Sequence, residues 1–179
     1  MGLFDRLFRS DLQRRMTDLR PRLQRTAQAW CGCPCLADDL VQEALLKAWR
    51  KQHQLKDSSS LDTWLFSILA NCCRDHFRRG GEPDGRETGT VPQQRSAEEE
   101  VTAEQTVLQV RKAIERLVPG QREVLVLVDL EEFTYAEVGQ ILGLPLGTVM
   151  SRLNRARQRL RLLLESYHRA GPAYLERVK

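Results

Sequence analysis

Apolar and polar residues follow a helical period over residues 134–160, TYAEVGQILGLPLGTVMSRLNRARQRL. Thr134 and Glu137 stand three apart before an apolar run, which is the capping-box spacing that begins a helix. Gly143 and Pro145 then leave room only for a tight turn. The two apolar stripes comprise Tyr135, Val138, Ile141 and Leu142, and then Val149, Leu153, Ala156 and Leu160. The pattern predicts a helix-turn-helix.

Helical periodicity also predicts elements over residues 12–30, 38–52 and 61–79, and after residue 103 along Val107, Val110, Ile114 and Leu117. Pro21 is expected to interrupt the first helix, and a turn is expected over residues 31–36. Asp38 and Asp39 are placed in the first turn of the second helix, and residues 54–60 in a polar loop. The inward stripes of the second and third helices comprise Leu40, Val41, Ala44, Leu45, Ala48 and Trp49, and Leu61, Trp64, Leu65, Ile68, Cys72 and Phe77.

The run VLVLV over residues 124–128 would indicate a strand if it stood alone. Because Pro119 opens this segment and helices flank it, a lone strand would have no partner, and a helix is predicted instead. The fold class is therefore expected to be all-α.

Charge is distributed unevenly along the 179 residues, whose net charge is +4. The first 25 residues hold seven arginines against three aspartates, whereas residues 80–103 hold six acids against two arginines. Glycine and proline in that acidic stretch predict a flexible linker. Apolar residues (41%) and charged residues (29%) have the proportions of a globular chain. We expect two small helical domains joined by a flexible acidic linker.

No apolar stretch approaches the roughly 20 residues that span a bilayer. The N-terminal MGLFDRLFRSDLQRR has no long apolar core and no small-residue cleavage site, which argues against a signal peptide. Its stripe of Leu3, Phe4, Leu7 and Phe8 favours packing on the next helix over a membrane-surface role. A cytoplasmic protein without stable membrane insertion is expected.

The five cysteines are Cys31, Cys33, Cys35, Cys72 and Cys73. They are expected to be reduced in the cytoplasm, and an odd number does not suit a disulfide framework. The run CGCPC places Cys31, Cys33 and Cys35 closer together than the usual zinc spacing. No metal or cofactor is expected, although a thiol- or metal-sensing role of these three residues stays open.

The second helix of the helix-turn-helix has a basic outward face. Residues 146–164 contain five arginines and no acid, whereas a merely solvated helix normally mixes charge signs. Arginine binds phosphates, and it is also the commonest partner of guanine in the major groove. The outward face comprises Thr148, Ser151, Arg152, Arg155, Gln158 and Arg159. DNA binding is therefore favoured.

Four segments together resemble the extracytoplasmic-function branch of bacterial RNA polymerase sigma factors. The family's core-polymerase-binding helix is similar to residues 37–50, ADDLVQEALLKAWR. Its promoter-melting and minus-ten segment is similar to residues 61–79, LDTWLFSILANCCRDHFRR. Its minus-thirty-five-binding domain is similar to residues 117–160, LVPGQREVLVLVDLEEFTYAEVGQILGLPLGTVMSRLNRARQRL, and its variable linker to the acidic spacer. The resemblance covers about residues 10–165.

The resemblance implies domain boundaries and site residues by position. The implied units are sigma domain two (1–80), the linker (81–103), sigma domain four (104–165) and a C-terminal tail (166–179). The implied core-polymerase contacts or supports are Asp39, Leu40, Gln42, Glu43 and Trp49. The implied minus-ten DNA residues are Lys56, Ser58, Ser59, Trp64, Asn71, Arg74 and Arg78. The implied minus-thirty-five DNA residues are Thr148, Ser151, Arg152, Asn154, Arg155 and Arg159.

Alternative roles stay open for several of these residues. Leu40 and Trp49 equally suit a core position, each serine taken singly rather suits a generic polar loop, and Trp64 suits a brace from the core. Amides and hydroxyls in the loop would suit the edge of a flipped base. Asn154 and Met150 depart from the family pattern, which implies an unusual upstream element.

The expected function is that of an alternative sigma factor that is not itself an enzyme. The implied partners are core RNA polymerase, through its largest subunits, promoter DNA and an anti-sigma factor. A rival interpretation is an autonomous, dimeric helix-turn-helix regulator, but the acidic helix over residues 37–50 argues against it. A thiol- or metal-responsive variant of the sigma factor is compatible with the main interpretation.

Overall fold

The computed structural model describes residues 3–55, 57–80 and 103–173, and within these ranges every element is helical. In chain order the elements are α1 (Leu3–Cys31), α2 (Pro34–Lys51), the 3₁₀ turns η1 (Gln52–Gln54) and η2 (Ser58–Ser60), α3 (Leu61–Arg79), α4 (Ala103–Glu115), α5 (Pro119–Leu125), the π-helical turn η3 (Val126–Leu130), α6 (Tyr135–Leu142) and α7 (Leu146–Ala173). The all-α prediction is confirmed, including the helical assignment of VLVLV. The predicted linker lies outside the described residues except for Ala103.

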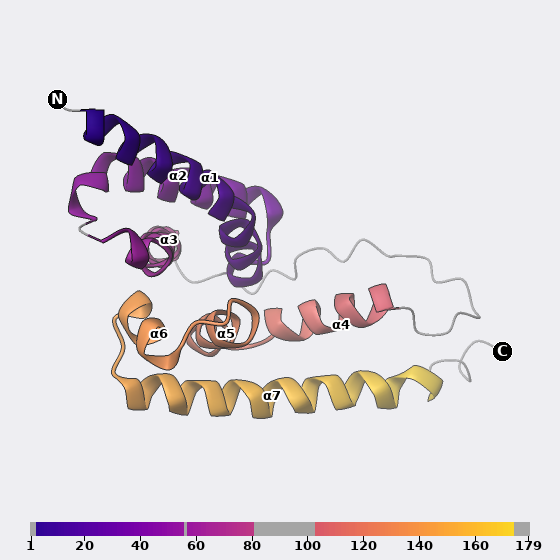
Figure 1. The fold of residues 1–179 in the computed structure, drawn as a ribbon. Coiled ribbons are helices and arrows are strands. Elements are labelled where there is room, and N and C mark those ends of the chain that lie inside the picture. Colours follow the sequence, from indigo (N-terminus) through magenta and orange to yellow (C-terminus); the bar gives the residue numbers. More distant parts are fainter. Residues whose placement is uncertain (1–2, 56, 81–102, 174–179) are drawn as a thin grey trace.

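The first half of the molecule is built from α1, α2 and α3, each of which contacts the other two (Figure 1). The predicted interruption at Pro21 is wrong, because α1 continues through this residue. Proline removes one backbone hydrogen bond, but Pro21 is exposed and the turns around it bury Leu19 and Leu23. Packing of the apolar face therefore outweighs the local cost of proline.

The connection between α1 and α2 is shorter than the expected turn over residues 31–36. Gly32 has φ 71°, and its N–H donates to the carbonyl of Gln28 at 2.8 Å, which closes α1. Pro34 then occupies the beginning of α2, where its missing N–H costs no helical hydrogen bond. Since α2 begins at Pro34, Asp38 and Asp39 lie beyond its first turn, and that expectation is also wrong.

The second half contains the predicted helix-turn-helix, formed by α6 and α7. The Thr134 hydroxyl accepts the Glu137 N–H at 3.3 Å, and the Glu137 carboxylate accepts the Thr134 N–H at 2.8 Å, so the capping box is confirmed. Gly143 ends α6 with φ 66°, a left-handed conformation that glycine adopts without a steric penalty. Helices α4, α5 and α6 all pack against α7, which runs the length of this half (Figure 1).

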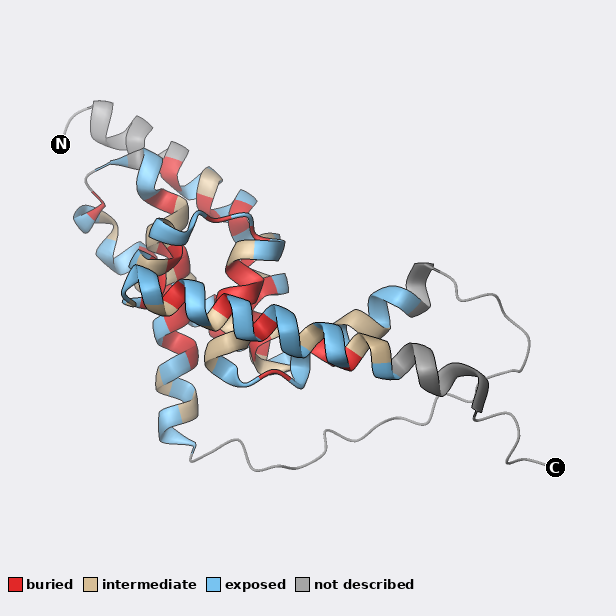
Figure 2. Cartoon of the chain, turned by 90° about the horizontal axis from the view of Figure 1, so that it is seen from below, coloured by how far each residue is buried: buried red, intermediate tan, exposed pale blue. Residues whose placement is uncertain are grey.

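The two halves pack directly against each other. Helix α6 lies against α3, while α1 contacts α4, α5 and η3. Buried residues run through both halves, and the exposed residues lie along the outer faces, including that of α7 (Figure 2). Residues from both halves therefore contribute to one continuous core.

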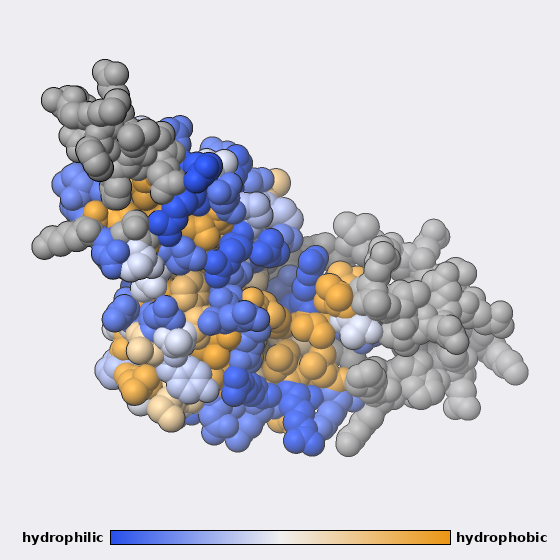
Figure 3. All heavy atoms as spheres, in the orientation of Figure 1, coloured by the Kyte–Doolittle hydropathy of each residue, from blue (hydrophilic) through white to orange (hydrophobic). Residues whose placement is uncertain are grey.

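Three apolar residues of the predicted inward stripes are exposed instead, namely Trp49 (43%), Val107 (51%) and Tyr135 (37%). Apolar surface also gathers over α4 and toward the adjoining part of α7 (Figure 3). The exposed apolar residues of these two helices include Val107 and Leu108 in α4 and Leu162 in α7. Within the described ranges, no helix has both the length and the apolar character needed to cross a membrane.

Candidate nucleic-acid interface

The outward face of α7 carries most of the predicted minus-thirty-five residues. Ser151, Asn154, Arg155 and Arg159 are exposed, while Thr148 and Arg152 are half-buried. The helix is fixed from behind, because Val149, Leu153 and Ala156 of its opposite face are buried. The buried and the exposed residues of α7 therefore lie on opposite faces of the helix, as the apolar periodicity predicts.

The five arginines over residues 146–164 of α7 have different partners. The Arg157 guanidinium donates two hydrogen bonds to the Asp129 carboxylate, at 3.1 and 2.6 Å, and so joins α7 to η3. Arg161 pairs with Glu165 one turn along the helix at 2.9 Å. Within the described part of the chain, Arg155 and Arg159 have no hydrogen bond or ion pair. These two side chains are also exposed, and they are therefore available to an external anion.

Arg152 lies in a more enclosed position than the other candidates. Gly120 packs closely against Arg152, because a Cβ atom at position 120 would lie 2.8 Å from Nη1 of Arg152. The nearby Glu123 is half-buried, and burial raises the pKa of this carboxyl although Arg74, Arg152 and Arg122 lower it in part. The positive charges of two candidate DNA-binding arginines therefore act on Glu123: Arg74 from the first half and Arg152 from the second.

The exposed face of α3 carries Asn71, Arg74 and Arg78, spaced so that they share one side of the helix. Arg74 donates to the Asn71 side-chain oxygen at 3.2 Å and to the Leu142 carbonyl of α6 at 3.3 Å. Arg78 pairs with Asp75 at 3.0 Å. Trp64 is half-buried against the core, which agrees with a bracing role.

The loop before α3 is organised by Asp57, a residue that the sequence analysis did not single out. Its carboxylate accepts the Ser59 N–H at 2.9 Å and also the Ser59 hydroxyl, and these bonds lower the pKa of Asp57. The Asp57 carbonyl accepts the Ser60 hydroxyl at 2.8 Å. An aspartate two residues before a serine is a common turn signal and would have identified it. Lys56 and the side chain of Ser58 lie outside the described residues.

The predicted polymerase-binding residues of α2 divide into two groups. Leu40 is buried (2% exposed), so it supports the helix from the core. Asp39, Gln42, Glu43 and Trp49 are exposed, and Glu43 pairs with Lys47 at 2.8 Å, which raises the pKa of Lys47. Gln42 and Trp49 line a groove of about 370 Å³ between α1 and α2. Its other lining residues are Gln13, Met16, Thr17, Arg20, Leu45 and Leu46.

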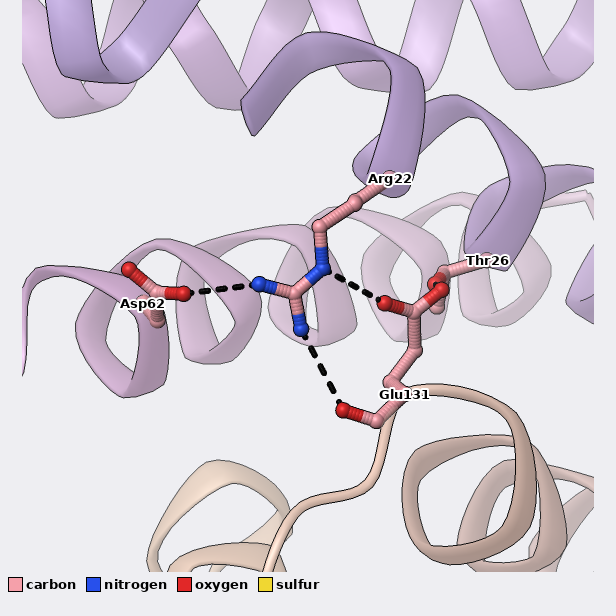
Figure 4. Close-up of polar contacts among 4 residues, drawn as sticks. All are labelled: Arg22, Thr26, Asp62 and Glu131. Atoms are coloured by element: carbon pink, nitrogen blue, oxygen red, sulfur yellow. Dashed lines mark hydrogen bonds and ion pairs between the residues drawn. The ribbon is translucent and has the colours of Figure 1, made fainter. Parts of the chain in front are cut away.

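A polar cluster that the sequence analysis missed joins the two halves, and we name it the Glu131 cluster: Arg22, Thr26, Asp62 and Glu131 (Figure 4). Glu131 is 8% exposed and accepts from Arg22 Nε and from the Thr26 hydroxyl, each at 2.9 Å. Arg22 also donates to Asp62 at 2.8 Å. Nothing in the local sequence pairs residues separated by more than a hundred positions, so no local signal identified the cluster.

The cysteine-rich turn shows no arrangement typical of a metal site. Cys35 is exposed, and the Cys31 thiol donates to the Cys33 carbonyl at 3.3 Å. Burial raises the pKa of Cys31, which disfavours the thiolate that metals bind. Among the described residues, no three His, Cys, Asp or Glu side chains lie close enough together to hold a metal ion.

Two matched regions define the class of the protein as a sigma factor. Residues 16–82 match Sigma-70 region 2, and residues 108–160 match Sigma-70, region 4. The ECF RNA polymerase sigma factor EcfG of Rhodopseudomonas palustris is 35% identical over 144 residues, which are 80% of each chain. SigM of Mycobacterium tuberculosis is 32% identical over 161 residues, or 90% of this chain and 76% of the relative. The chain therefore belongs to the ECF family of RNA polymerase sigma factors.

Solved structures are similar over both halves. The sigma factor RpoE of Bartonella quintana, in complex with the anti-sigma factor NepR, has a TM-score of 0.68 and 31% identity over 87% of this chain and 97% of that one. CnrH, in complex with the cytosolic domain of CnrY, has a TM-score of 0.62 and 27% identity over 86% of this chain and 90% of that one. The protein is thus an alternative sigma factor that directs transcription initiation, and the autonomous-regulator interpretation is not favoured.

Proposed function

We propose that the protein docks on core RNA polymerase through the groove between α1 and α2. The groove is lined by exposed apolar side chains, Leu46 (58% exposed) and Trp49, together with polar residues such as Gln42. Exposed apolar side chains framed by polar ones are typical of protein interaction sites, and tryptophan is prominent among the residues that dominate binding energy. This groove is the observation that carries the proposal, and its proposed occupant is a helical segment of the largest polymerase subunits.

We propose that α7 reads the upstream promoter element. Arg155 projects near the middle of the exposed face, where a guanidinium suits the two acceptors of a guanine. Arg159 lies one turn further along and would neutralise a phosphate. Ser151 and Asn154 on the same face supply shorter polar contacts.

The downstream element is assigned to α3 and the loop before it. Asn71 offers an amide for a base edge, and Arg74 and Arg78 offer charge for the strand's phosphates. The Ser59 hydroxyl donates to Asp57 in this loop, so Ser59 would contact a base as an acceptor, through the lone pairs of its hydroxyl oxygen. Trp64 supports the helix from the core side.

The protein acts by binding and not by catalysis in this proposal, and it works in the cytoplasm where polymerase and promoters are found. An anti-sigma factor is the proposed inhibitory partner. The support is that RpoE of Bartonella quintana, similar to this chain over 87% of its length, forms a complex with the anti-sigma factor NepR.

The test of polymerase docking is the double variant Gln42→Ala/Glu43→Ala. Both side chains are exposed, so the change in unfolding free energy should stay within about 0.5 kcal/mol for each site. Affinity for core polymerase should fall by about fivefold or more, which corresponds to about 1 kcal/mol. Fluorescence anisotropy of labelled sigma factor titrated with core enzyme measures this affinity, and run-off transcription reports its consequence.

The matched control is Arg161→Ala/Glu165→Ala. It also removes one ion pair between residues four apart on a helix, but it lies on α7, away from the groove. The control should bind core polymerase as the wild type does. Equal affinities of the two double variants for core enzyme would contradict docking through this face.

A further inference from the structure

The exposed surface over the first three turns of α7 carries two neighbouring rows of residues. One row consists of Leu146, Met150 and Asn154, and the other of Gly147, Ser151 and Arg155. The members of each row are four residues apart, so they follow one another along the same side of the helix. The second row ends in polar and charged groups that are already proposed to contact DNA, whereas the first row begins with two apolar side chains.

Met150 is exposed although the helix around it carries mostly polar groups on its outer face. It is 51% exposed, and between residues 147 and 161, all of which the structure describes, it is the only exposed large apolar residue. The apolar residues Val149, Leu153 and Ala156 are buried and fix the helix from behind, so the core does not need Met150. Its flexible thioether side chain is therefore available for an apolar contact with a molecule that binds this face.

The backbone beside Met150 is uncovered. Gly147 follows Leu146 at the beginning of α7, and a Cβ atom at position 147 would lie in open space. Crowding inside the chain therefore does not require a glycine here. A glycine at the exposed start of a helix lets a ligand approach the backbone closely, and the N–H groups of the first turn attract phosphate. This end of α7 is thus open to a close approach of DNA.

The position of Met150 along α7 determines which part of the DNA it would meet. In a helix-turn-helix, the second helix lies in the major groove and its N-terminal residues contact the edges of the bases. Met150 lies in the second turn of α7, so the proposed docking brings it to the base edges. Among the four bases, only thymine presents an apolar group in the major groove, its C5-methyl. Contact between this methyl group and Met150 would remove both from water.

We propose that Met150 is a specificity-determining residue, which recognises a thymine of the upstream promoter element through the C5-methyl group of that base. The inference rests on the proposed function, since it names the base that one position of α7 selects. Met150 has no charge and no hydrogen-bond donor, so its contribution depends on the base and not on the phosphates.

The probe for the test is a duplex with the upstream element that wild-type holoenzyme selects from promoter DNA randomised at that element. Each thymine of the selected element is replaced in turn by deoxyuridine, which removes the methyl group and keeps the O4 acceptor. Competition binding should show a position at which this replacement weakens wild-type binding about fourfold, the effect of leaving one methyl-sized apolar group in water. Met150→Ala holoenzyme should not distinguish the two bases at that position, whereas Met150→Leu, which keeps an apolar side chain, should.

The matched control is Leu162→Ala, because Leu162 is also an exposed apolar residue of α7 (58%) but lies about three turns further along. It should keep the wild-type preference for thymine over deoxyuridine. The dependence of affinity on salt concentration should be the same for Met150→Ala and wild type, because no phosphate contact is lost. A reduced salt dependence of Met150→Ala would contradict a contact with a base.

The outcomes separate this inference from the proposed function. A selected element without thymine, or equal discrimination between thymine and deoxyuridine by wild type and Met150→Ala, would overturn the inference. The proposed function would still stand if Arg155→Ala weakened binding to the selected element. Wild-type holoenzyme that selects no upstream sequence would reject both. If Met150→Ala loses helical circular dichroism, Met150→Gln takes its place, and loss of helix in both variants would also overturn the inference.

Discussion

The arginines of α7 and those of α3 differ in their hydrogen-bonding and ionic partners, although both helices are proposed to contact DNA. Arg155 and Arg159 of α7 are exposed and, within the described residues, have no hydrogen-bonding or ionic partner. Arg74 of α3 is bonded to Asn71 and to α6, and Arg78 is paired with Asp75. The face of α7 is thus available as it stands, whereas the face of α3 must first exchange partners.

This difference affects the free energy that each helix gains on binding. A phosphate that binds Arg159 replaces only water, but one that binds Arg74 also replaces the Leu142 carbonyl. A typical intramolecular hydrogen bond contributes about 0.5–1.5 kcal/mol net, so the gain at Arg74 is reduced by that order. Upstream contact should therefore precede downstream contact when the sigma factor meets DNA.

The largest expected effect is that of Arg155→Ala on upstream recognition. Loss of a bidentate contact with guanine should reduce the binding free energy by about 1–3 kcal/mol and relax the sequence preference at a single base pair. Arg159→Ala is the contrast, because loss of a phosphate contact should weaken binding to all sequences evenly and reduce the salt slope by about one. Binding to every single-base variant of the site measures both changes. Wild-type sequence preferences in Arg155→Ala would rule out base reading by this residue.

Arg74→Ala should have a smaller effect, on formation of the open complex. The variant loses a contact with the strand but also loses the bond to Leu142, so the net cost should be about 0.5–1.5 kcal/mol. Potassium permanganate footprinting of the melted promoter measures it, with Arg79→Ala, also exposed at the end of α3, as a control. A loss larger than that of Arg155→Ala would reverse the comparison between the two helices.

The smallest expected effect is that of Glu123→Gln on thermal stability. Burial raises the pKa of Glu123, so the charged carboxylate is disfavoured in the folded state more than in the unfolded one. This penalty is absent below the ordinary glutamate pKa, grows as the pH rises from that pKa to the raised one, and is complete above the raised pKa. Glu123→Gln should therefore raise Tm at pH 7 but not at pH 4, whereas the exposed Glu132→Gln should not reproduce this pH dependence. An increase in the Tm of Glu123→Gln at pH 4 but not at pH 7 would contradict this prediction.

Local signals in the sequence identified most of the fold. The capping box of Thr134 and Glu137 and the left-handed Gly143 follow from short-range chemistry, and the structure has both. Pro21 misled the prediction because its local cost is outweighed by packing on either side of it. The beginning of α2 was placed too late because the aspartates gave a stronger signal than Pro34.

Contacts between distant residues were not predictable in the same way. Glu131 follows an apolar run and is itself followed by Glu132, so the sequence pattern indicates two solvated acids. Only the packing of the halves shows that Glu131 is buried against Arg22 and that Glu132 is exposed. Periodicity describes one element at a time, and it carries no information on which elements meet.

Covalent connection of the halves through residues 81–102 changes what their interface needs to achieve. Two tethered surfaces meet at an effective concentration of roughly millimolar, so an interface too weak to join separate fragments can still close the intact chain. The closing equilibrium then depends on the tether as well as on the contacts, and each doubling of its length would cost about 0.6 kcal/mol. Changes in the length of this spacer would therefore adjust how readily the two halves separate, without altering any residue that is proposed to contact polymerase or DNA.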